Sequence, residues 1–177
     1  MSLSSTGGAG TASTIWNNTA PSSTVITLGT DTSINQNGAT YVAYCFAPVA
    51  GYSSFGSYTG NGSADGPFVY TGFRPRWVMW KMSSSTSHWW IIDTARSTYN
   101  VTNNLLFPNL SDAETTGFSI APSATGFKAN VLTAGQTYIY IAIRRGPMKT
   151  PTVGTSVFTP KTRTGTGSAT TVTGISA

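Results

Sequence analysis

The side chains that could carry acid–base or metal chemistry are few and scattered along this chain of 177 residues. The carboxylates, the single histidine and the single cysteine are Asp31, Asp65, Asp93, Asp112, Glu114, His88 and Cys45. A glycosidase needs two carboxylates that face each other across a sugar, and the spacing of the carboxylates supports no such pair. A Ser–His–acid triad would have to use His88, but no serine lies in a nucleophile-elbow pattern. The sequence therefore predicts a protein that is not an enzyme.

A metal site is not predicted either. One histidine and one cysteine cannot supply the three or four ligands that zinc takes. Calcium stays open, because Asp, Asn and backbone carbonyl oxygens suffice for it and the loop Asn61–Gly66 resembles a calcium loop in composition. No other cofactor is expected.

Aromatic side chains are the stronger lead to a function, because sugars stack on exposed aromatic faces. Aromatic residues make up 12% of the chain. The candidate glycan-binding residues are Trp77, Trp89, Trp90, Tyr58 and Tyr99. The alternative, which is favoured for any single ring, is that it fills the core, where aromatic rings bury a large area. Trp89 and Trp90 are adjacent and point to opposite faces of a strand, so at least one can leave the core.

The basic residues form a second candidate site. All ten Lys and Arg lie from Arg74 onward, and the net charge is +5. Five of them fall within twenty residues, namely Arg144, Arg145, Lys149, Lys161 and Arg163. They could contact an acidic partner such as phosphate, an anionic glycan or an acidic neighbouring subunit. A basic linker between two domains is the favoured alternative, and nucleic acid is not expected, because aromatic residues are not interleaved with these charges.

The overall composition predicts an all-β protein with a neutral, hydroxylated surface. Charged residues make up only 8% of the chain, against roughly 25% in typical soluble domains. Disordered chains lack aromatic residues, and helical bundles need more Glu, Lys and Arg than this chain has. No secretory signal is visible, and no apolar run approaches the roughly 18 residues of a membrane span.

Short strand-like runs bounded by turn residues place these side chains on an antiparallel β-sandwich or a jelly-roll-like fold. The expected strands are Ser23–Leu28, Thr40–Phe46, Pro67–Tyr70, Trp77–Met82, His88–Asp93, Phe127–Val131, Thr137–Ile143, Ser156–Thr159 and Thr170–Val172. The clearest pair is the hairpin of Trp77–Met82 and His88–Asp93, and an ion pair of Asp93 with Arg96 is expected to fix the turn after it. The only helical turn expected is Ser111–Glu114, which has a capping pattern.

An internal repeat organises the chain. The segment Gly38–Phe46 matches Gly135–Ile143 at an offset of 97 residues. Val42, Tyr44 and Phe46 then take the same positions as Ile139, Ile141 and Ile143, and this face is expected to point into the core. Further collinear matches pair Thr59–Ala64 with Thr164–Ala169 and Tyr70–Phe73 with Val172–Ile175.

The repeat predicts four regions. Residues 1–14 are a flexible lead-in, 15–46 the end of a preceding repeat unit, 47–143 a complete β unit, and 144–177 a basic linker with the start of a next unit. Either the chain is a fragment of a tandem array, or neighbouring copies complete each other.

At these residues the chain resembles a repeat domain of tail-fibre and other virion proteins of tailed phages, many of them marine. The runs that carry the resemblance are Gly51–Gly62, Asp65–Pro75, the aromatic hairpin, Asp93–Arg96, Ser111–Thr116, Gly126–Lys128, Gly135–Tyr140 and Trp16–Pro21. The family has no established catalytic residues that could be assigned to positions of this chain. The resemblance implies a virion structural protein, a tail-fibre or adhesin module that recognises host surface glycans; the alternative is a capsid-associated decoration protein. Because the edge strands of such modules are usually covered by neighbours, a homo-oligomer or tight packing against other virion proteins is expected, and a bacterial surface polysaccharide is a further expected partner.

Overall fold

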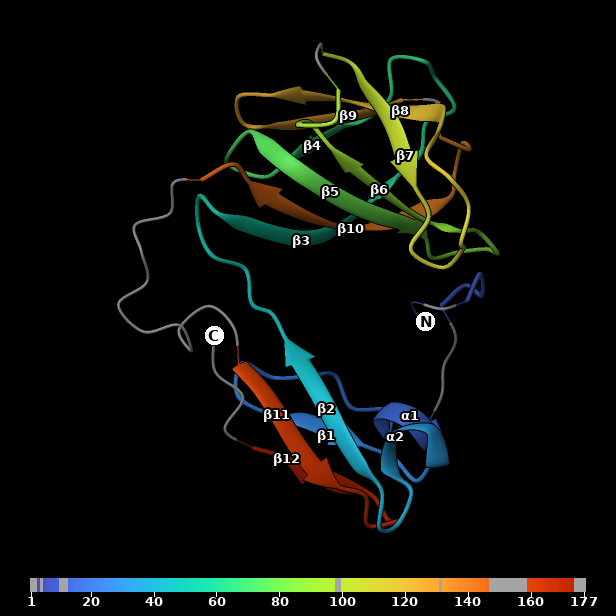
Figure 1. Cartoon of the computed structure of the whole chain (residues 1–177), viewed down its shortest axis with the longest axis vertical. Coiled ribbons are helices and arrows are strands. Elements are labelled where there is room, and N and C mark those ends of the chain that lie inside the picture. The colour runs from blue at the N-terminus through green and yellow to red at the C-terminus, as the bar shows by residue number, and fades with distance from the viewer. Residues whose placement is uncertain are drawn as a thin grey trace. The chain divides into compact units, whose positions relative to one another are not determined.

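The chain forms two compact units. The computed structural model (Figure 1) describes residues 3, 5–9, 13–97, 100–130, 132–146 and 159–173. Unit 1 comprises residues 1–9 and 48–148, and unit 2 comprises residues 10–47 and 149–177. Each unit is therefore assembled from two stretches that lie far apart in the sequence.

Unit 1 contains one antiparallel sheet of eight strands in the order β3-β10-β5-β6-β7-β8-β9-β4. These strands are β3 (Ser53–Thr59), β4 (Phe68–Tyr70), β5 (Pro75–Met82), β6 (Trp89–Asp93), β7 (Thr102–Leu106), β8 (Thr115–Ser123), β9 (Gly126–Asn130) and β10 (Thr137–Arg144). Every strand pair is antiparallel. The predicted all-β, antiparallel, sandwich-like fold is confirmed.

The sheet curls around one apolar core. Tyr58 on β3 and Phe127 on β9 come from opposite ends of the strand order, yet their ring centroids are 6.1 Å apart. In Figure 1 the β8, β9 and β4 end of the sheet accordingly lies over the β5, β10 and β3 end. The core residues are Val69, Phe73, Val78, Trp80, Trp90, Ile92, Leu105, Ile120, Phe127, Ala129, Leu132, Tyr138, Tyr140 and Ala142.

The expected core face of β10 is wrong. Tyr138, Tyr140 and Ala142 are buried, whereas Ile139 and Ile141 are only half-buried. The curled sheet has an inner and an outer face, and alternate residues of a strand point to opposite faces. Because both sets of β10 side chains are largely apolar, the pattern alone did not show which face turned inward.

The predicted tryptophan hairpin is confirmed as β5 and β6, in which Trp80 lies opposite Trp90. The predicted ion pair of Asp93 with Arg96 is wrong. Asp93 Oδ1 instead accepts from Arg76 Nε at 2.9 Å, and Arg76 directly precedes Trp77, the residue opposite Asp93 on β5. Arg96 forms its ion pair with Glu114.

Three strands of unit 1 were not anticipated, namely β3, β7 and β8. Gly, Ser and Asn interrupt their apolar pattern, and β8 contains Pro122. The expected helical turn Ser111–Glu114 is wrong as well, because that segment is not helical and Glu114 pairs with Arg96. The described helices are α1 (Ser13–Trp16) and α2 (Thr32–Asn35), and Asp31 caps α2 by accepting from Ser33 N. Neither is long and apolar enough to cross a membrane.

The first residues of the chain were expected to be a flexible lead-in, but they hydrogen-bond to the loop between β5 and β6. Ala9 N donates to Ser83 O at 2.7 Å, and Ser87 N donates to Thr6 O at 2.9 Å. The Lys81 amine donates to Thr6 O at 2.8 Å and to Ser87 O at 2.6 Å. Lys81 is therefore a buried side chain that ties the first residues to the β5–β6 loop. The expected boundaries at residues 14, 46 and 143 stay predictions.

Burial of Lys81 should make the stability of unit 1 depend on pH. Burial lowers the pKa of the Lys81 amine below its ordinary 10.5. Between the two pKa values the unfolded chain binds more protons than the folded chain, so stability rises with pH across that window. We expect the free energy of unfolding of the wild type, relative to Lys81→Met, to increase from neutral pH toward about pH 10 in urea titrations. A difference in unfolding free energy between the two proteins that stays constant with pH would contradict this prediction.

Unit 2 contains two short antiparallel pairs. These are β1 (Ile26–Leu28) with β12 (Thr170–Val172), and β2 (Thr40–Cys45) with β11 (Thr159–Thr164). Asn35 at the end of α2 is fully buried and joins the pairs: its amide donates to Gly29 O and Ser168 O, and its Oδ1 accepts from Thr166 N. The strand expected at Ser156–Thr159 lies outside the described residues except for Thr159.

The internal repeat extends to backbone hydrogen bonds. In unit 1 the recurring bonds are Gly60 N to Gln136 O, Gly135 N to Gly60 O, and Gly62 N to Leu132 O. In unit 2 they are Gly165 N to Ala39 O, Gly38 N to Gly165 O, and Gly167 N to Asn35 O. Gly60 and Gly165 are both required, because a Cβ there would lie 2.3 Å from Thr133 O and 1.7 Å from Gln36 O. The β3–β10 pair and the β11–β2 pair are thus two copies of one structure.

Candidate functional site

The strand register of unit 1 brings four arginines together around one cavity. Arg74 and Arg76 lie at the start of β5, and Arg144 and Arg145 at the end of β10. These ends meet because β5 and β10 are antiparallel and Arg144 pairs with Pro75. The register shifts between Ile143 and Arg144, and such irregularities, β-bulges among them, often re-aim side chains at the edge of a sheet. We call this cavity the arginine pocket.

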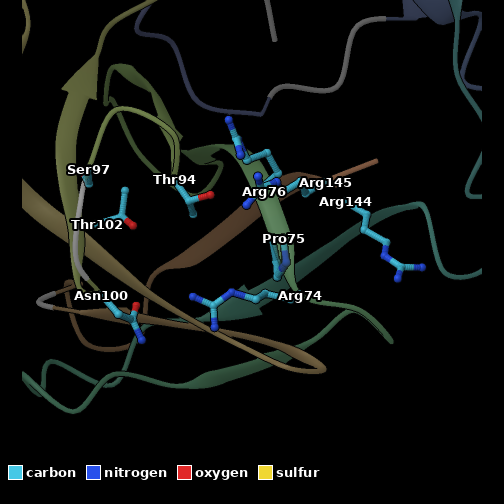
Figure 2. A pocket seen from close by; sticks show the side chains of 9 residues that line it. All are labelled: Arg74, Pro75, Arg76, Thr94, Ser97, Asn100, Thr102, Arg144 and Arg145. Atoms are coloured by element: carbon cyan, nitrogen blue, oxygen red, sulfur yellow. The ribbon is translucent and has the colours of Figure 1, made fainter. Parts of the chain in front are cut away.

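The arginine pocket has a volume of about 280 Å³. Its remaining polar wall consists of Thr94, Ser97, Asn100 and Thr102 (Figure 2). In Figure 2 the Arg74 side chain extends toward Asn100, whereas Arg144 points away from that wall. The pocket therefore places the Arg74 guanidinium opposite hydroxyl and amide groups.

The arginines of the pocket differ in their partners. Arg76 is half-buried and paired with Asp93, whose Oδ1 also accepts from Ala95 N at 2.7 Å. Arg144 Nη1 reaches Gly51 O at 3.4 Å. Arg74 and Arg145 are exposed, and neither has a carboxylate partner within the described ranges of the chain. The pocket thus carries an excess of positive charge that the described residues do not neutralise.

This arrangement suits a small anionic group. A guanidinium presents planar donors that match carboxylate, sulfate and phosphate oxygens in two-point contacts. A cavity lined by one sign of charge raises the local concentration of ions of opposite sign. The volume is near the lower end for ligand pockets, so it fits one acidic substituent or one acidic sugar rather than a long ligand. The hydroxyl of Thr94 on the pocket wall can hydrogen-bond a neighbouring sugar hydroxyl.

The structure divides the predicted basic cluster between the two units. Arg144 and Arg145 line the arginine pocket, whereas Lys161 and Arg163 lie on β11 in unit 2. Arg163 Nη2 contacts Asn35 Oδ1, and its guanidinium lies 5.9 Å from the Tyr41 ring centroid, so it supports the fold of unit 2. Lys149 lies outside the described residues.

Arg74 and Arg76 were missed in the sequence because they are about seventy residues from Arg144 and carry no local motif. The only signal was their position just before Trp77–Met82, the first strand of the predicted hairpin.

The predicted glycan-binding aromatics do not form one exposed surface. Trp89 and Trp90 are 8% and 6% exposed, and the Tyr58 ring stacks on Tyr138 with centroids 5.5 Å apart. Trp77 is half-buried, and Tyr99 lies outside the described residues. Glycan binding at these side chains stays a prediction, but the buried rings offer a sugar little surface.

Tyr58 supports a prediction about stability. Its hydroxyl is buried without a hydrogen-bond partner among the described residues, and burial, with Tyr138 and Tyr140 nearby, raises the pKa of Tyr58. Tyr138, by contrast, accepts from Thr133 N at 3.2 Å through its hydroxyl. We expect Tyr58→Phe to be neutral or to stabilise by about 1 kcal/mol, and Tyr138→Phe to destabilise by about 1–2 kcal/mol. Urea unfolding of both variants measures the difference, and a larger loss for Tyr58→Phe would refute it.

Asp65, Glu114 and His88 each have a structural partner. Asp65 pairs with Lys128, Glu114 pairs with Arg96, and His88 Nδ1 lies 3.0 Å from Asn109 Nδ2. Within the residues that the structure describes, no group of three or more His, Cys, Asp and Glu gathers to hold a metal. A calcium ion in the Asn61–Gly66 loop would have to compete with Lys128 for Asp65.

Comparison with known proteins gives a family. No curated protein and no solved structure matches the chain. One family model matches residues 1–147, which include all of β1–β10 and end before β11. The chain belongs to the family described as Domain of unknown function (DUF7483).

Proposed function

We propose that the chain is a non-enzymatic structural and binding module of a phage virion protein, and that its arginine pocket binds acidic groups of a host surface polysaccharide. The observation that carries the binding role is the set of four arginines around one cavity, three of which lack a carboxylate partner among the described residues. Such an unneutralised cluster suits an anionic ligand better than it suits a purely structural site.

The structural role draws support from the repeat. Units 1 and 2 share a strand pair with the same backbone hydrogen bonds, which is the behaviour of a repeat-built protein. The low content of charged residues suits a surface that packs against other chains. Edge strands of such modules are usually covered by neighbours, and a homo-oligomer is part of this proposal.

The location in a phage particle rests on the resemblance to tail-fibre repeats. A tail-fibre or adhesin module would display the arginine pocket toward the host cell. Density for this chain at the tail of a phage particle is the expected result, and many copies on the icosahedral shell would indicate a capsid decoration protein instead.

Direct binding tests the adhesin function. The full chain would be titrated with bacterial polysaccharides in three groups: neutral, carboxylated, and sulfated or phosphorylated. We expect retention of acidic polysaccharides only, with an affinity that falls as salt screens the charges. Binding of neutral polysaccharides with equal strength, or of none, would contradict the role of the arginine pocket.

A further inference from the structure

The described residues of unit 2 form four strands that correspond to four of the eight strands of unit 1. Removing β5–β8 from the unit 1 order leaves the pairs β3–β10 and β9–β4. The described strands of unit 2 form the pairs β11–β2 and β1–β12. The repeat equates β11 with β3 and β2 with β10, and the match of Tyr70–Phe73 with Val172–Ile175 equates β12 with β4. We infer that unit 2 is an acceptor for the β5–β8 segment, residues 75–123, of another copy of this repeat.

The edge of β2 is the point where that segment would attach. In unit 1, β10 has β3 on one side and β5 on the other. In unit 2, β11 is the strand that pairs with β2 in the described part of the chain. Residues of an antiparallel strand direct their N–H and C=O groups alternately to the two sides. Thr137 O accepts from Ser83 N on the β5 side of β10. Its counterpart Thr40 therefore directs its backbone groups to the edge of β2 that faces away from β11.

Side-chain burial supports the same conclusion. On the inner face of β10, Tyr138 and Ala142 are 1% and 0% exposed, because the curled sheet covers them. Their counterparts on β2, Tyr41 and Cys45, are only half-buried. On the outer face, Val42 is 54% exposed, whereas its counterpart Ile139 is half-buried beside Lys81 of β5. Both faces of β2 are therefore less covered than those of β10, as expected of a sheet that lacks counterparts of β5–β8 among its described strands.

The occupant follows from the register of β5 on β10. Ile139 lies opposite Lys81, Ile141 opposite Met79 and Ala142 opposite Val78. A strand with the β5 sequence would place Lys81 opposite Val42 and Val78 opposite Cys45. Because the acceptor strand keeps the β10 pattern, a strand of this repeat fits the edge better than an unrelated one.

An extended chain tests the inference. A second copy of residues 74–123 would replace Ser176 and Ala177, which align with Arg74 and Pro75 of the first copy. A matched control would carry Val78→Asp and Trp80→Asp in the added copy only, because these substitutions keep the length but prevent burial. Hydrogen exchange at the amides of Thr40 and Val42 reports on the β2 edge.

Cys45 is a second probe, because it is the single cysteine and its counterpart Ala142 is fully buried. We expect the intact extension to slow exchange at Thr40 and Val42 and thiol modification of Cys45 by at least tenfold, and the control extension to change neither. Unchanged rates in the intact extension, or equal slowing in the control, would overturn the inference. Protection in the unextended chain that rises with protein concentration would show pairing between two β2 edges and would also overturn it.

Discussion

Replacing Arg74 and Arg145 together with alanine is expected to weaken binding of an acidic polysaccharide about 100-fold. These two arginines line the arginine pocket without a carboxylate partner among the described residues, so a ligand would meet their charge directly. A hydrogen bond to a charged group contributes about 1.5–3 kcal/mol. Each 1.4 kcal/mol corresponds to a factor of about ten in affinity. Titration of the variant and the wild type with one acidic polysaccharide measures the effect.

The control must remove the same charge elsewhere. Lys128→Ala with Lys161→Ala also removes two positive charges, one on β9 and one on β11, outside the pocket. Lys128 is in an exposed ion pair with Asp65, and such pairs contribute little to stability. We expect this variant to bind within about threefold of the wild type, since a remote charge acts only through a screened field. Equal losses in both variants would show attraction to net charge alone and would refute a specific pocket.

Replacing Phe127 with alanine is expected to lower the free energy of unfolding of unit 1 by about 3–5 kcal/mol. Phe127 is fully buried, and its ring contacts Tyr58 and Tyr140 edge-on at centroid distances of 6.1 Å and 5.6 Å. These contacts join β9 to β3 and β10 across the core, so the substitution leaves a cavity where the curled ends of the sheet meet. Urea unfolding followed by tryptophan fluorescence is suitable, because four of the five tryptophans lie in unit 1.

Phe68 provides a matched control on the neighbouring strand. It lies on β4, which pairs with β9, but it is 49% exposed. We expect Phe68→Ala to cost less than about 1 kcal/mol, because little apolar area is returned to water. Similar losses of unfolding free energy for the two substitutions would show that the two ends of the curled sheet do not pack against Phe127.

Part of the fold follows from local sequence. The β5–β6 hairpin is predicted by two aromatic runs around a short polar loop, and β10 by its continuous apolar run. β3 escaped prediction because its sequence Ser53–Thr59 contains little apolar area of its own. It is a strand because β10 offers an edge with which its backbone pairs over seven residues. Tertiary pairing therefore outweighs the weak local preference.

The candidate site shows a similar division. The sequence singled out Arg144 and Arg145 by their position in a basic run, and that prediction of an acidic partner stays untested. Arg74 and Arg76 joined them only because β5 and β10 are antiparallel neighbours with Arg144 opposite Pro75. The aromatic candidates were chosen by residue type, and residue type does not tell a buried ring from an exposed one.

The sequence by itself determined the all-β class, the tryptophan hairpin and the repeat between Gly38–Phe46 and Gly135–Ile143. Each of these depends on composition or on the order of residues along one strand. Only the tertiary structure decided which face of β10 is buried, where Asp93 finds its partner and which arginines share a cavity. Those outcomes depend on strand register and on the curl of the sheet, which bring together residues that are distant in the sequence.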